Sequence, residues 1–300
     1  MPYTARLVLA ACVAALGLTA CGSTPSGGHR LQVVAAENFW GSIASQLAGD
    51  RADVRSIVTN PDTDPHSYDP TASDARTMAG AQVAIVNGIG YDSWASHLLA
   101  ANPDSSRVVL TVGDLLGLAD GDNPHQWYSP PAVERVVDAI SAAYAKADPS
   151  DAAYFAKRKQ LFLTRSLASY HALLQQIRRQ YAGAPVGYSE SIFQPLGSYL
   201  GLRLLTPYSF AKAVAEGSDV SAADTRTVEA QLSRHLIRVW VFNGQNVTPE
   251  IDHLNSIARA EHIPIVTVTE TLSPANLDFE QWQVAQLEQL RAALAQSAGG

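Results

Sequence analysis

Cysteine is nearly absent from this chain: its 300 residues contain only Cys12 and Cys21. The sequence beyond Cys21 therefore has no disulfide framework and no thiolate that could bind a metal ion. If that part of the chain binds a metal, nitrogen and oxygen atoms must coordinate it. Runs of lysine and arginine are missing as well, and the formal net charge is −7. An acidic chain without a polybasic patch disfavours nucleic acid as a partner and suits the attraction of cations.

Apolar runs long enough to span a membrane are missing too. The N-terminal run, Leu7–Leu18, is shorter than the roughly 20 residues of a spanning helix, and it follows Arg6, so it predicts a signal peptide over residues 1–20. The run closes on LTAC, which resembles a bacterial lipobox. We therefore expect lipidation at Cys21, a tether over 21–30, and an extracytoplasmic protein anchored to the cell membrane. The alternative is an ordinary signal peptide that happens to contain a cysteine.

Short apolar runs alternate with helical patterns along the rest of the chain, which is long enough for two domains. This alternation predicts mostly parallel sheets covered by helices, so we expect an α/β protein with two Rossmann-like lobes, over residues 31–147 and 184–300. The predicted strands are 31–37, 54–59, 82–87, 107–112, 184–190, 202–207, 237–243 and 264–270. The predicted helices are 39–49, 71–80, 91–101, 131–147, 192–200, 223–235, 248–261 and 277–297.

The longest helical pattern lies between these lobes. Asp148 is a good N-cap and Pro149 suits the first helical position. Apolar residues then follow at spacings of three and four, which places them on one face of a helix. They are Leu163, Leu167, Tyr170, Leu174, Ile177 and Tyr181. We expect one long rigid helix over 148–183 that connects the lobes; a peripheral amphipathic helix is the alternative.

Two of the eight histidines lie in similar loops. His66 is in DPHSYDP (64–70) and His125 is in NPHQWYSP (123–130), and a proline precedes each histidine. Proline fixes its own φ and restricts the residue before it, so each imidazole has little conformational entropy left to lose. Both loops also follow predicted strands, where open α/β sheets place ligand sites. A metal-binding or catalytic role competes here with a turn-capping role. Tyr68 and Trp127 are expected to pack beside the histidines and exclude water.

Two carboxylates occupy corresponding places in the second lobe. Glu190 and Glu270 each end a predicted strand. Either glutamate alone is more simply explained as an exposed helix N-cap. Together with His66 and His125 they form a set of two nitrogen and two oxygen donors, which suits Zn²⁺ or Mn²⁺.

This combination resembles the solute-binding proteins of zinc and manganese ABC importers, whose two lobes are joined by one long helix. The two histidine loops resemble the loops that carry that family's first two ligands, and NGIGYDSW (87–94) is similar to its Asn-Gly strand end. SESIFQPLGSYLGL and VTVTETL are similar to the segments with its third and fourth ligands. The resemblance implies that His66, His125, Glu190 and Glu270 coordinate the metal.

The resemblance also implies a function. We expect a monomer that captures one Zn²⁺ or Mn²⁺ ion in the cleft between the lobes and delivers it to the permease and ATPase of an ABC importer. Two features depart from the family pattern: Glu270 replaces the more usual aspartate, and the long histidine-rich loop of some zinc-specific members is absent. Glu190 as third ligand leans towards harder cations such as Mn²⁺, but Zn²⁺ stands above Mn²⁺ in the Irving–Williams order.

Two other classes of protein remain as alternatives. A secreted metallohydrolase would use histidine and glutamate ligands, but catalytic zinc keeps one position open for water and four protein ligands would fill it. The HExxH and GxSxG motifs are also missing from the sequence. We therefore expect a protein that is not an enzyme. An interaction or adhesion lipoprotein with structural histidines would retain no stoichiometric metal.

Overall fold

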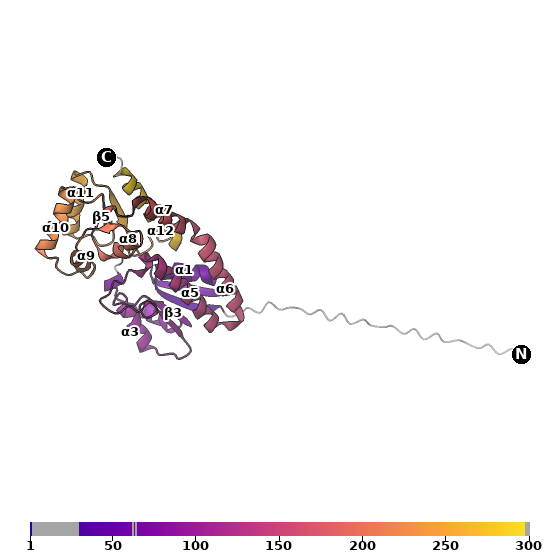
Figure 1. Ribbon diagram of the computed structural model, residues 1–300. Coiled ribbons are helices and arrows are strands. Elements are labelled where there is room, and N and C mark those ends of the chain that lie inside the picture. The colour runs from indigo at the N-terminus through magenta and orange to yellow at the C-terminus, as the bar shows by residue number, and fades with distance from the viewer. Residues whose placement is uncertain (2–29, 62, 64, 298–300) are drawn as a thin grey trace.

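The computed structural model describes Met1 and residues 30–61, 63 and 65–297 (Figure 1). Apart from Met1, the predicted signal peptide lies outside the described residues, as do Cys21 and nearly all of the predicted tether. Among the described residues, no helix combines the length and the apolar character needed to cross a bilayer.

The first lobe contains a parallel sheet whose strands lie within two residues of the predicted ones. They are β1 (Leu31–Glu37), β2 (Ala52–Val58), β3 (Val83–Val86) and β4 (Val108–Thr111). Its helices are α1 (Asn38–Ala48), α2 (Ala72–Ala79), α3 (Ser93–Ala101), α4 (Val112–Leu116) and α5 (Pro130–Ala147). The strand order is β2-β1-β3-β4, and each pair is parallel.

The second lobe repeats this architecture. Its strands are β5 (Pro185–Tyr188), β6 (Arg203–Leu204), β7 (Val239–Asn243) and β8 (Ile265–Val268), in the parallel order β6-β5-β7-β8. Its helices are α8 (Gln194–Tyr199), α9 (Tyr208–Ala215), α10 (Ala222–Ser233), α11 (Pro249–Ala260) and α12 (Phe279–Gln296). The sequence analysis missed α9, although Phe210, Ala211 and Val214 bury one side of it. The predicted fold class is confirmed.

The shared strand order determines where a ligand can bind. In each sheet the chain reverses its direction of winding between the first and third strands, β1 and β3 or β5 and β7. Loops leave the carboxyl ends of these strands on opposite sides of the sheet, which opens a crevice between them. Glu37 ends β1, Asn243 ends β7 and Glu190 follows β5, so buried polar residues gather at these crevices.

The segment between the lobes is helical as predicted, but it is not one continuous α-helix. It consists of a 3₁₀ turn (Pro149–Asp151), α6 (Ala152–Leu161), a π-helical turn (Phe162–Ser166) and α7 (Ala168–Tyr181). The Leu167 N–H donates to the Phe162 carbonyl oxygen at 3.0 Å, which is the i→i−5 pairing of a π-turn. The predicted apolar stripe is real, because Leu167, Leu174 and Ile177 are buried.

One hydrophobic cluster runs through both lobes. It includes Val33 and Ile85 from the first sheet and Val186 and Val241 from the second. Helix α12 packs against both α7 and α1, and Figure 1 shows it alongside them. Since the lobes share buried apolar surface, separating them widely would expose part of that core to water.

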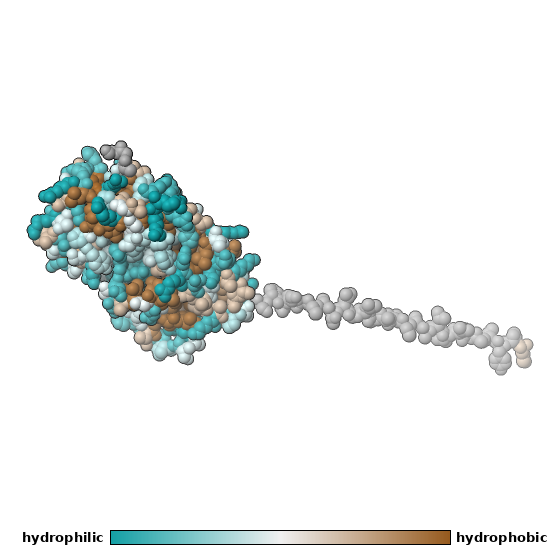
Figure 2. Space-filling view, viewed as in Figure 1, coloured by the Kyte–Doolittle hydropathy of each residue, from teal (hydrophilic) through white to brown (hydrophobic). Residues whose placement is uncertain are grey.

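The surface is mainly hydrophilic, in keeping with the acidic composition. Figure 2 shows teal residues over most of the visible face, with brown patches between them. Among the described residues from Arg30 onward, the large apolar side chains classed as exposed are Val109, Tyr208, Leu236 and Val247.

Candidate metal centre

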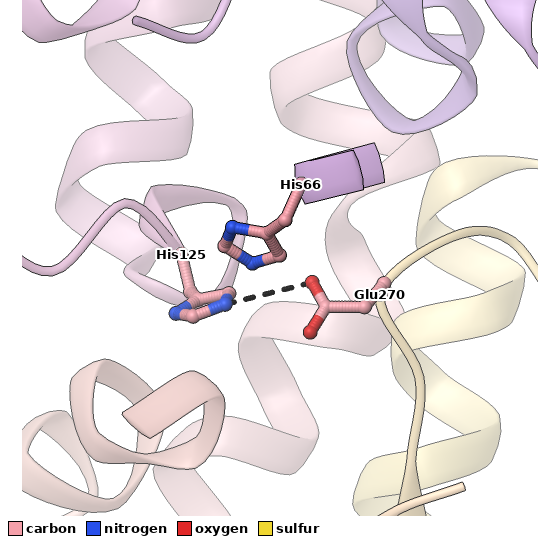
Figure 3. Close-up of side chains that lie close together, drawn as sticks. All are labelled: His66, His125 and Glu270. Carbon is pink, nitrogen blue, oxygen red and sulfur yellow. Dashed lines mark ion pairs between the residues drawn. The ribbon is translucent and has the colours of Figure 1, made fainter. Parts of the chain in front are cut away.

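Three potential metal ligands converge where the lobes meet. His66 and His125 come from the first lobe and Glu270 from the second, and one ligand atom of each lies within 4.8 Å of the others. Figure 3 shows the His66 imidazole beside that of His125, with the Glu270 carboxylate facing them. Two ligand atoms of a tetrahedral zinc ion are about 3.4 Å apart when each bond is about 2.05 Å long. The observed group is somewhat wider than such a site.

The fourth predicted residue, Glu190, lies beside the same imidazole. His125 Nε2 is 3.7 Å from Glu190 Oε1 and 3.5 Å from Glu270 Oε2. Glu190 is not part of the more compact group of three ligand atoms. The structure thus brings together all four residues that the sequence singled out, with His125 Nε2 within 4 Å of both carboxylates.

Short turns position both histidines. His66 is exposed and lies in a 3₁₀ turn (Pro65–Ser67) after β2, whereas His125 is buried and directly precedes a 3₁₀ turn (Gln126–Tyr128). The preceding Pro124 is anchored as well, because its carbonyl oxygen accepts a hydrogen bond from Asn87 Nδ2 at 3.0 Å. The exposed His66 therefore lies on the solvent side of the centre, and His125 lies at its base.

A neighbouring asparagine determines which nitrogen of His125 faces the site. Asn123 Oδ1 accepts a hydrogen bond from the His125 backbone N–H at 3.0 Å, and it lies 2.8 Å from His125 Nδ1. The Asn123 Nδ2 group donates to the Ser191 carbonyl oxygen at 2.8 Å, which fixes the orientation of the amide. Because Oδ1 can only accept, Nδ1 carries the proton and Nε2 presents its lone pair to the carboxylates.

Aromatic rings back the two imidazoles. The Trp127 ring lies 5.2 Å from the His125 ring, and Tyr91 lies 4.4 Å from His66, both measured between centroids. Trp127 thus packs beside a histidine as expected. Tyr68 packs on Trp94 instead, with centroids 4.9 Å apart. Tyr91, which the sequence analysis did not single out, takes the expected place beside His66.

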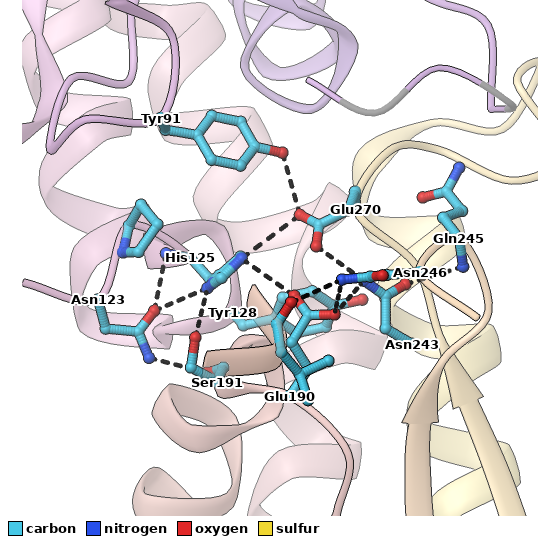
Figure 4. Close-up of polar contacts among 12 residues, drawn as sticks. Tyr91, Asn123, His125, Tyr128, Glu190, Ser191, Asn243, Gln245, Asn246 and Glu270 are labelled. Carbon is cyan, nitrogen blue, oxygen red and sulfur yellow. Dashed lines mark hydrogen bonds and ion pairs between the residues drawn. The ribbon is translucent and has the colours of Figure 1, made fainter. Parts of the chain in front are cut away.

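Amide groups hold the two carboxylates (Figure 4). Asn243 Nδ2 donates to Glu190 Oε2 and to Glu270 Oε1, both at 2.8 Å. Asn246 Nδ2 donates to Glu190 Oε2 at 3.2 Å. The Tyr91 hydroxyl donates to Glu270 Oε2 at 3.0 Å, across the boundary between the lobes. These contacts orient both carboxyl groups in the absence of any ion.

Burial sets the protonation of the centre. It raises the pKa of Glu190 to about 8, and the nearby Glu270 carboxylate adds to the rise. Burial also lowers the pKa of His125 to about 4, against the opposing effect of Glu190. Near pH 7 the metal-free centre therefore holds a neutral His125 and a protonated Glu190. In the part of the chain that the structure describes, His125 Nε2 and Glu190 Oε1 are buried without a hydrogen-bond partner.

A cavity of about 140 Å³ adjoins His66 and is lined from both lobes. Asn123 lines it from the first lobe, and Ser191 and Lys212 line it from the second. Lys212 Nζ donates to the Gly121 carbonyl oxygen at 2.9 Å and so links α9 to the first lobe. Of the four candidate ligands, His66 is the one that lines this cavity.

Three asparagines of this site were missed in the sequence analysis: Asn123, Asn243 and Asn246. A signal was present for one of them, because Asn243-Gly244 repeats the strand-ending Asn87-Gly88 of the first lobe. An asparagine that ends a buried strand beside ligand candidates is a candidate to orient them.

The family model for the periplasmic zinc-uptake complex component A matches residues 33–293. The chain is 30% identical over 158 residues to the manganese-binding lipoprotein MntA of Halalkalibacterium halodurans, an alignment that covers 50% of this chain and 52% of the relative. It is 25% identical over 253 residues to the iron-binding protein YfeA of Yersinia pestis, covering 81% of this chain and 71% of that protein. The chain thus spans about half the length of the first of these relatives.

Solved structures share the fold. The manganese-bound periplasmic metal-binding protein from Candidatus Liberibacter asiaticus superposes with a TM-score of 0.73 at 19% identity, covering 89% of this chain and 100% of that one. The nickel-bound FpvC of P. aeruginosa gives a TM-score of 0.71 at 20% identity, over 90% of this chain and 98% of that one. The resemblance drawn from the motifs is confirmed: the chain belongs to the family of the periplasmic zinc-uptake complex component A.

Proposed function

We propose that this protein captures one divalent transition-metal ion, Zn²⁺ or Mn²⁺, between its lobes and delivers it to an ABC importer. The observation that carries this proposal is the pair of buried, unpartnered atoms at the centre, His125 Nε2 and Glu190 Oε1, which lie 3.7 Å apart. Leaving buried polar atoms without a hydrogen bond costs free energy. A cation bound between them, His66 and Glu270 satisfies both.

The wider biological setting follows from the family. Relatives are named as metal-binding lipoproteins, among them the MntA protein above and the zinc-binding lipoprotein AdcA of Streptococcus pneumoniae. We propose that Cys21 is lipidated and holds the chain at the outer side of the cell membrane. The partners are then a permease and its ATPase subunit, and a monomer suffices for the task.

Capture and release involve small movements. The continuous hydrophobic core between the lobes opposes a wide opening. His66, the exposed ligand, lies in a short turn and is the one that can leave the ion with the least loss of packing. Movement of this loop, with a slight tilt between the lobes, gives the ion a way out.

A metallohydrolase is less well supported. Catalytic zinc needs an open coordination position for water or substrate, whereas His66, His125, Glu190 and Glu270 supply four protein ligands. The family is one of metal-binding receptors, and we propose that the protein is not an enzyme. An adhesion role with structural histidines would leave the unpartnered atoms at the centre unexplained.

Metal retention tests the proposal. The full-length chain, purified in a mild detergent and stripped of metal, is incubated with equal Mn²⁺ and Zn²⁺, desalted and analysed by elemental mass spectrometry. We expect about one equivalent of metal per chain, since the ligand atoms form one group. A variant with both His66→Ala and His125→Ala should retain none. A wild-type chain without metal after this treatment would refute the proposal.

A further inference from the structure

We propose that Asn243, assisted by Asn246, restricts each glutamate to a single coordinating oxygen and thereby makes the centre selective for Zn²⁺ over Mn²⁺. This inference rests on the proposed function, and it adds the identity of the preferred ion and the residues that determine it. It concerns two side chains that do not themselves lie among the candidate ligands.

The geometry separates the two oxygens of each carboxylate. Glu190 Oε2 accepts from Asn243 and Asn246, at 2.8 and 3.2 Å, while Oε1 lies 3.7 Å from His125 Nε2. Glu270 Oε1 accepts from Asn243 at 2.8 Å, while Oε2 lies 3.5 Å from the same His125 nitrogen. Figure 4 shows Asn243 beside both carboxylates, on the far side from His125. One oxygen of each glutamate thus faces the amides and the other faces the imidazole.

The orientation of the Asn243 amide is fixed by its own contacts. Its Oδ1 accepts the Gln245 backbone N–H at 3.0 Å, so Nδ2 is the group that faces the carboxylates. Both protons of Nδ2 are then used, one on each glutamate. The side chain is fully buried at the end of β7 and has no room to turn away. The amide therefore acts as a clamp on both carboxylates at once.

The clamp limits the number of ligand atoms. With one oxygen from each glutamate and one nitrogen from each histidine, the protein offers four donors, which suits tetrahedral Zn²⁺. Mn²⁺ prefers an octahedral shell rich in oxygen, which bidentate carboxylates would help to supply. A carboxylate oxygen that accepts one hydrogen bond can still bind an ion, as Glu270 Oε2, which accepts from Tyr91, would do. Binding through both oxygens, however, requires the carboxylate to turn, and turning either one would pull its other oxygen out of line with the Asn243 amide and weaken that buried hydrogen bond. The second oxygens are thus withheld from the ion, and the larger shell is disfavoured.

The test compares three variants of the full-length chain. Asn243→Ala removes the clamp, and Asn246→Ala removes only the weaker contact to Glu190. Asn255→Ala is the matched control, because Asn255 is also buried in the second lobe but bonds Trp240 Nε1, at 2.8 Å, instead of a candidate ligand. Dissociation constants for Zn²⁺ and Mn²⁺ are measured separately by chelator competition, and X-ray absorption gives the coordination number of each bound ion.

We expect four-coordinate zinc in the wild type and a Mn²⁺-to-Zn²⁺ ratio of dissociation constants that falls about 10-fold or more in Asn243→Ala. Asn246→Ala should lower this ratio less, and Asn255→Ala should leave it unchanged. Five or six ligands around zinc in the wild type would overturn the inference. The inference would also be overturned if the ratio were unchanged in both Asn243→Ala and Asn246→Ala. If Asn243→Ala failed to fold, an unchanged ratio in Asn246→Ala would be enough to overturn it. Failure of the wild type to bind either ion would instead refute the proposed function itself.

Discussion

The two lobes build their halves of the centre by different means. The first lobe supplies imidazoles and backs them with rings: Trp127 lies beside His125 and stacks on Phe39, with ring centroids 3.9 Å apart. The second lobe supplies carboxylates and holds them with the Asn243 amide. An imidazole is oriented by packing and one hydrogen bond, whereas a carboxylate has two equivalent oxygens, and only directed hydrogen bonds distinguish them.

The same Asn-Gly pair occurs at corresponding strand ends in both lobes, although Gly88 has a positive φ of 71° and Gly244 is not among the glycines with positive φ. Asn87-Gly88 follows β3 in the first lobe, and Asn243-Gly244 begins at the last residue of β7 in the second. Each glycine packs closely against a threonine, since an added Cβ would lie 2.8 Å from Thr111 Cγ2 at Gly88 and 2.6 Å from Thr267 Cγ2 at Gly244. The asparagines differ in their targets.

Asn87 acts on the backbone, because its Nδ2 donates to the Pro124 carbonyl oxygen and its Oδ1 accepts from Trp40 Nε1. It therefore holds the loop that carries His125 through the backbone of Pro124 rather than through the His125 side chain. Asn243 contacts the candidate ligands Glu190 and Glu270 directly. The same Asn-Gly pair at corresponding strand ends thus supports a loop in one lobe and contacts two candidate ligands in the other.

Removing the aromatic support should have the largest effect on stability. Trp127→Ala deletes a fully buried ring that contacts Phe39, Tyr91 and His125. We expect a loss of about 3–5 kcal/mol in the free energy of unfolding, measured by urea titration of the metal-free chain. Trp127→Phe keeps part of the stacking and should lose less. Equal losses in the two variants would show that ring packing does not support the first-lobe half of the centre.

Removing the buried imidazole should have the largest effect on binding. We expect His125→Ala to weaken zinc affinity at least about 100-fold, since even residues that only orient ligands account for 10–100-fold. His66→Ala should also weaken binding, but it should leave the stability of the metal-free chain nearly unchanged because His66 is exposed. Chelator competition and urea unfolding give the two quantities. Near-wild-type affinity in His125→Ala would remove His125 from the ligand set.

In the second lobe, protonation of Glu190 should make the free energy of unfolding depend on pH. Glu190 has a pKa of about 8 in the folded chain and an ordinary value of 4.5. The folded state therefore binds the extra proton between these values, and this group makes the metal-free chain less stable as pH rises towards 8. His125, with a pKa of about 4, has the opposite effect, which fades as the pH rises above its ordinary value of 6.5. Since His125 is also present in a Glu190→Gln variant, comparing the two chains from pH 6.5 to 8 isolates Glu190.

In that interval the wild type should lose up to about 1.4 kcal/mol per pH unit more than Glu190→Gln, or about 1.6 kcal/mol in all, because the group is already half ionised at pH 8. Urea unfolding at pH 6.5, 7.2 and 8 measures the difference, and the raised pKa of Glu37 affects both chains alike. Parallel pH profiles for the two chains would mean that Glu190 is ionised in the metal-free centre.

The contact between the lobes should have the smallest effect. Tyr91→Phe removes the 3.0 Å hydrogen bond to Glu270 Oε2 and keeps the ring beside His66. We expect a loss of about 1 kcal/mol in unfolding free energy, the usual value for one hydrogen bond. Zinc affinity should change less than in His125→Ala. A loss as large as that of Trp127→Ala would mean that this single contact couples the lobes.

Much of the fold could be predicted because it is locally encoded. Apolar runs for strands, helical periodicity and the Asp148-Pro149 helix start depend on residues close together in the chain, and they gave bounds close to those observed. The break in the predicted long helix could not be recognised from the sequence in the same way. The π-turn at Phe162–Ser166 keeps the apolar stripe on one side, so periodicity alone did not distinguish it from a continuous α-helix.

The sequence by itself determined the types of candidate ligand and the loops that carry them: two imidazoles after prolines, two carboxylates near strand ends and no thiolate beyond Cys21. Tertiary structure alone decided which atoms face one another. The choice between Oε1 and Oε2 of Glu190 and Glu270 depends on Asn243, and the free lone pair of His125 depends on Asn123. Asn243 lies far from both glutamates in the sequence and meets them because β5, β7 and β8 belong to one sheet. Asn123 is only two residues from His125, but its amide is oriented by the Ser191 carbonyl oxygen of the other lobe, so no local pattern records either arrangement.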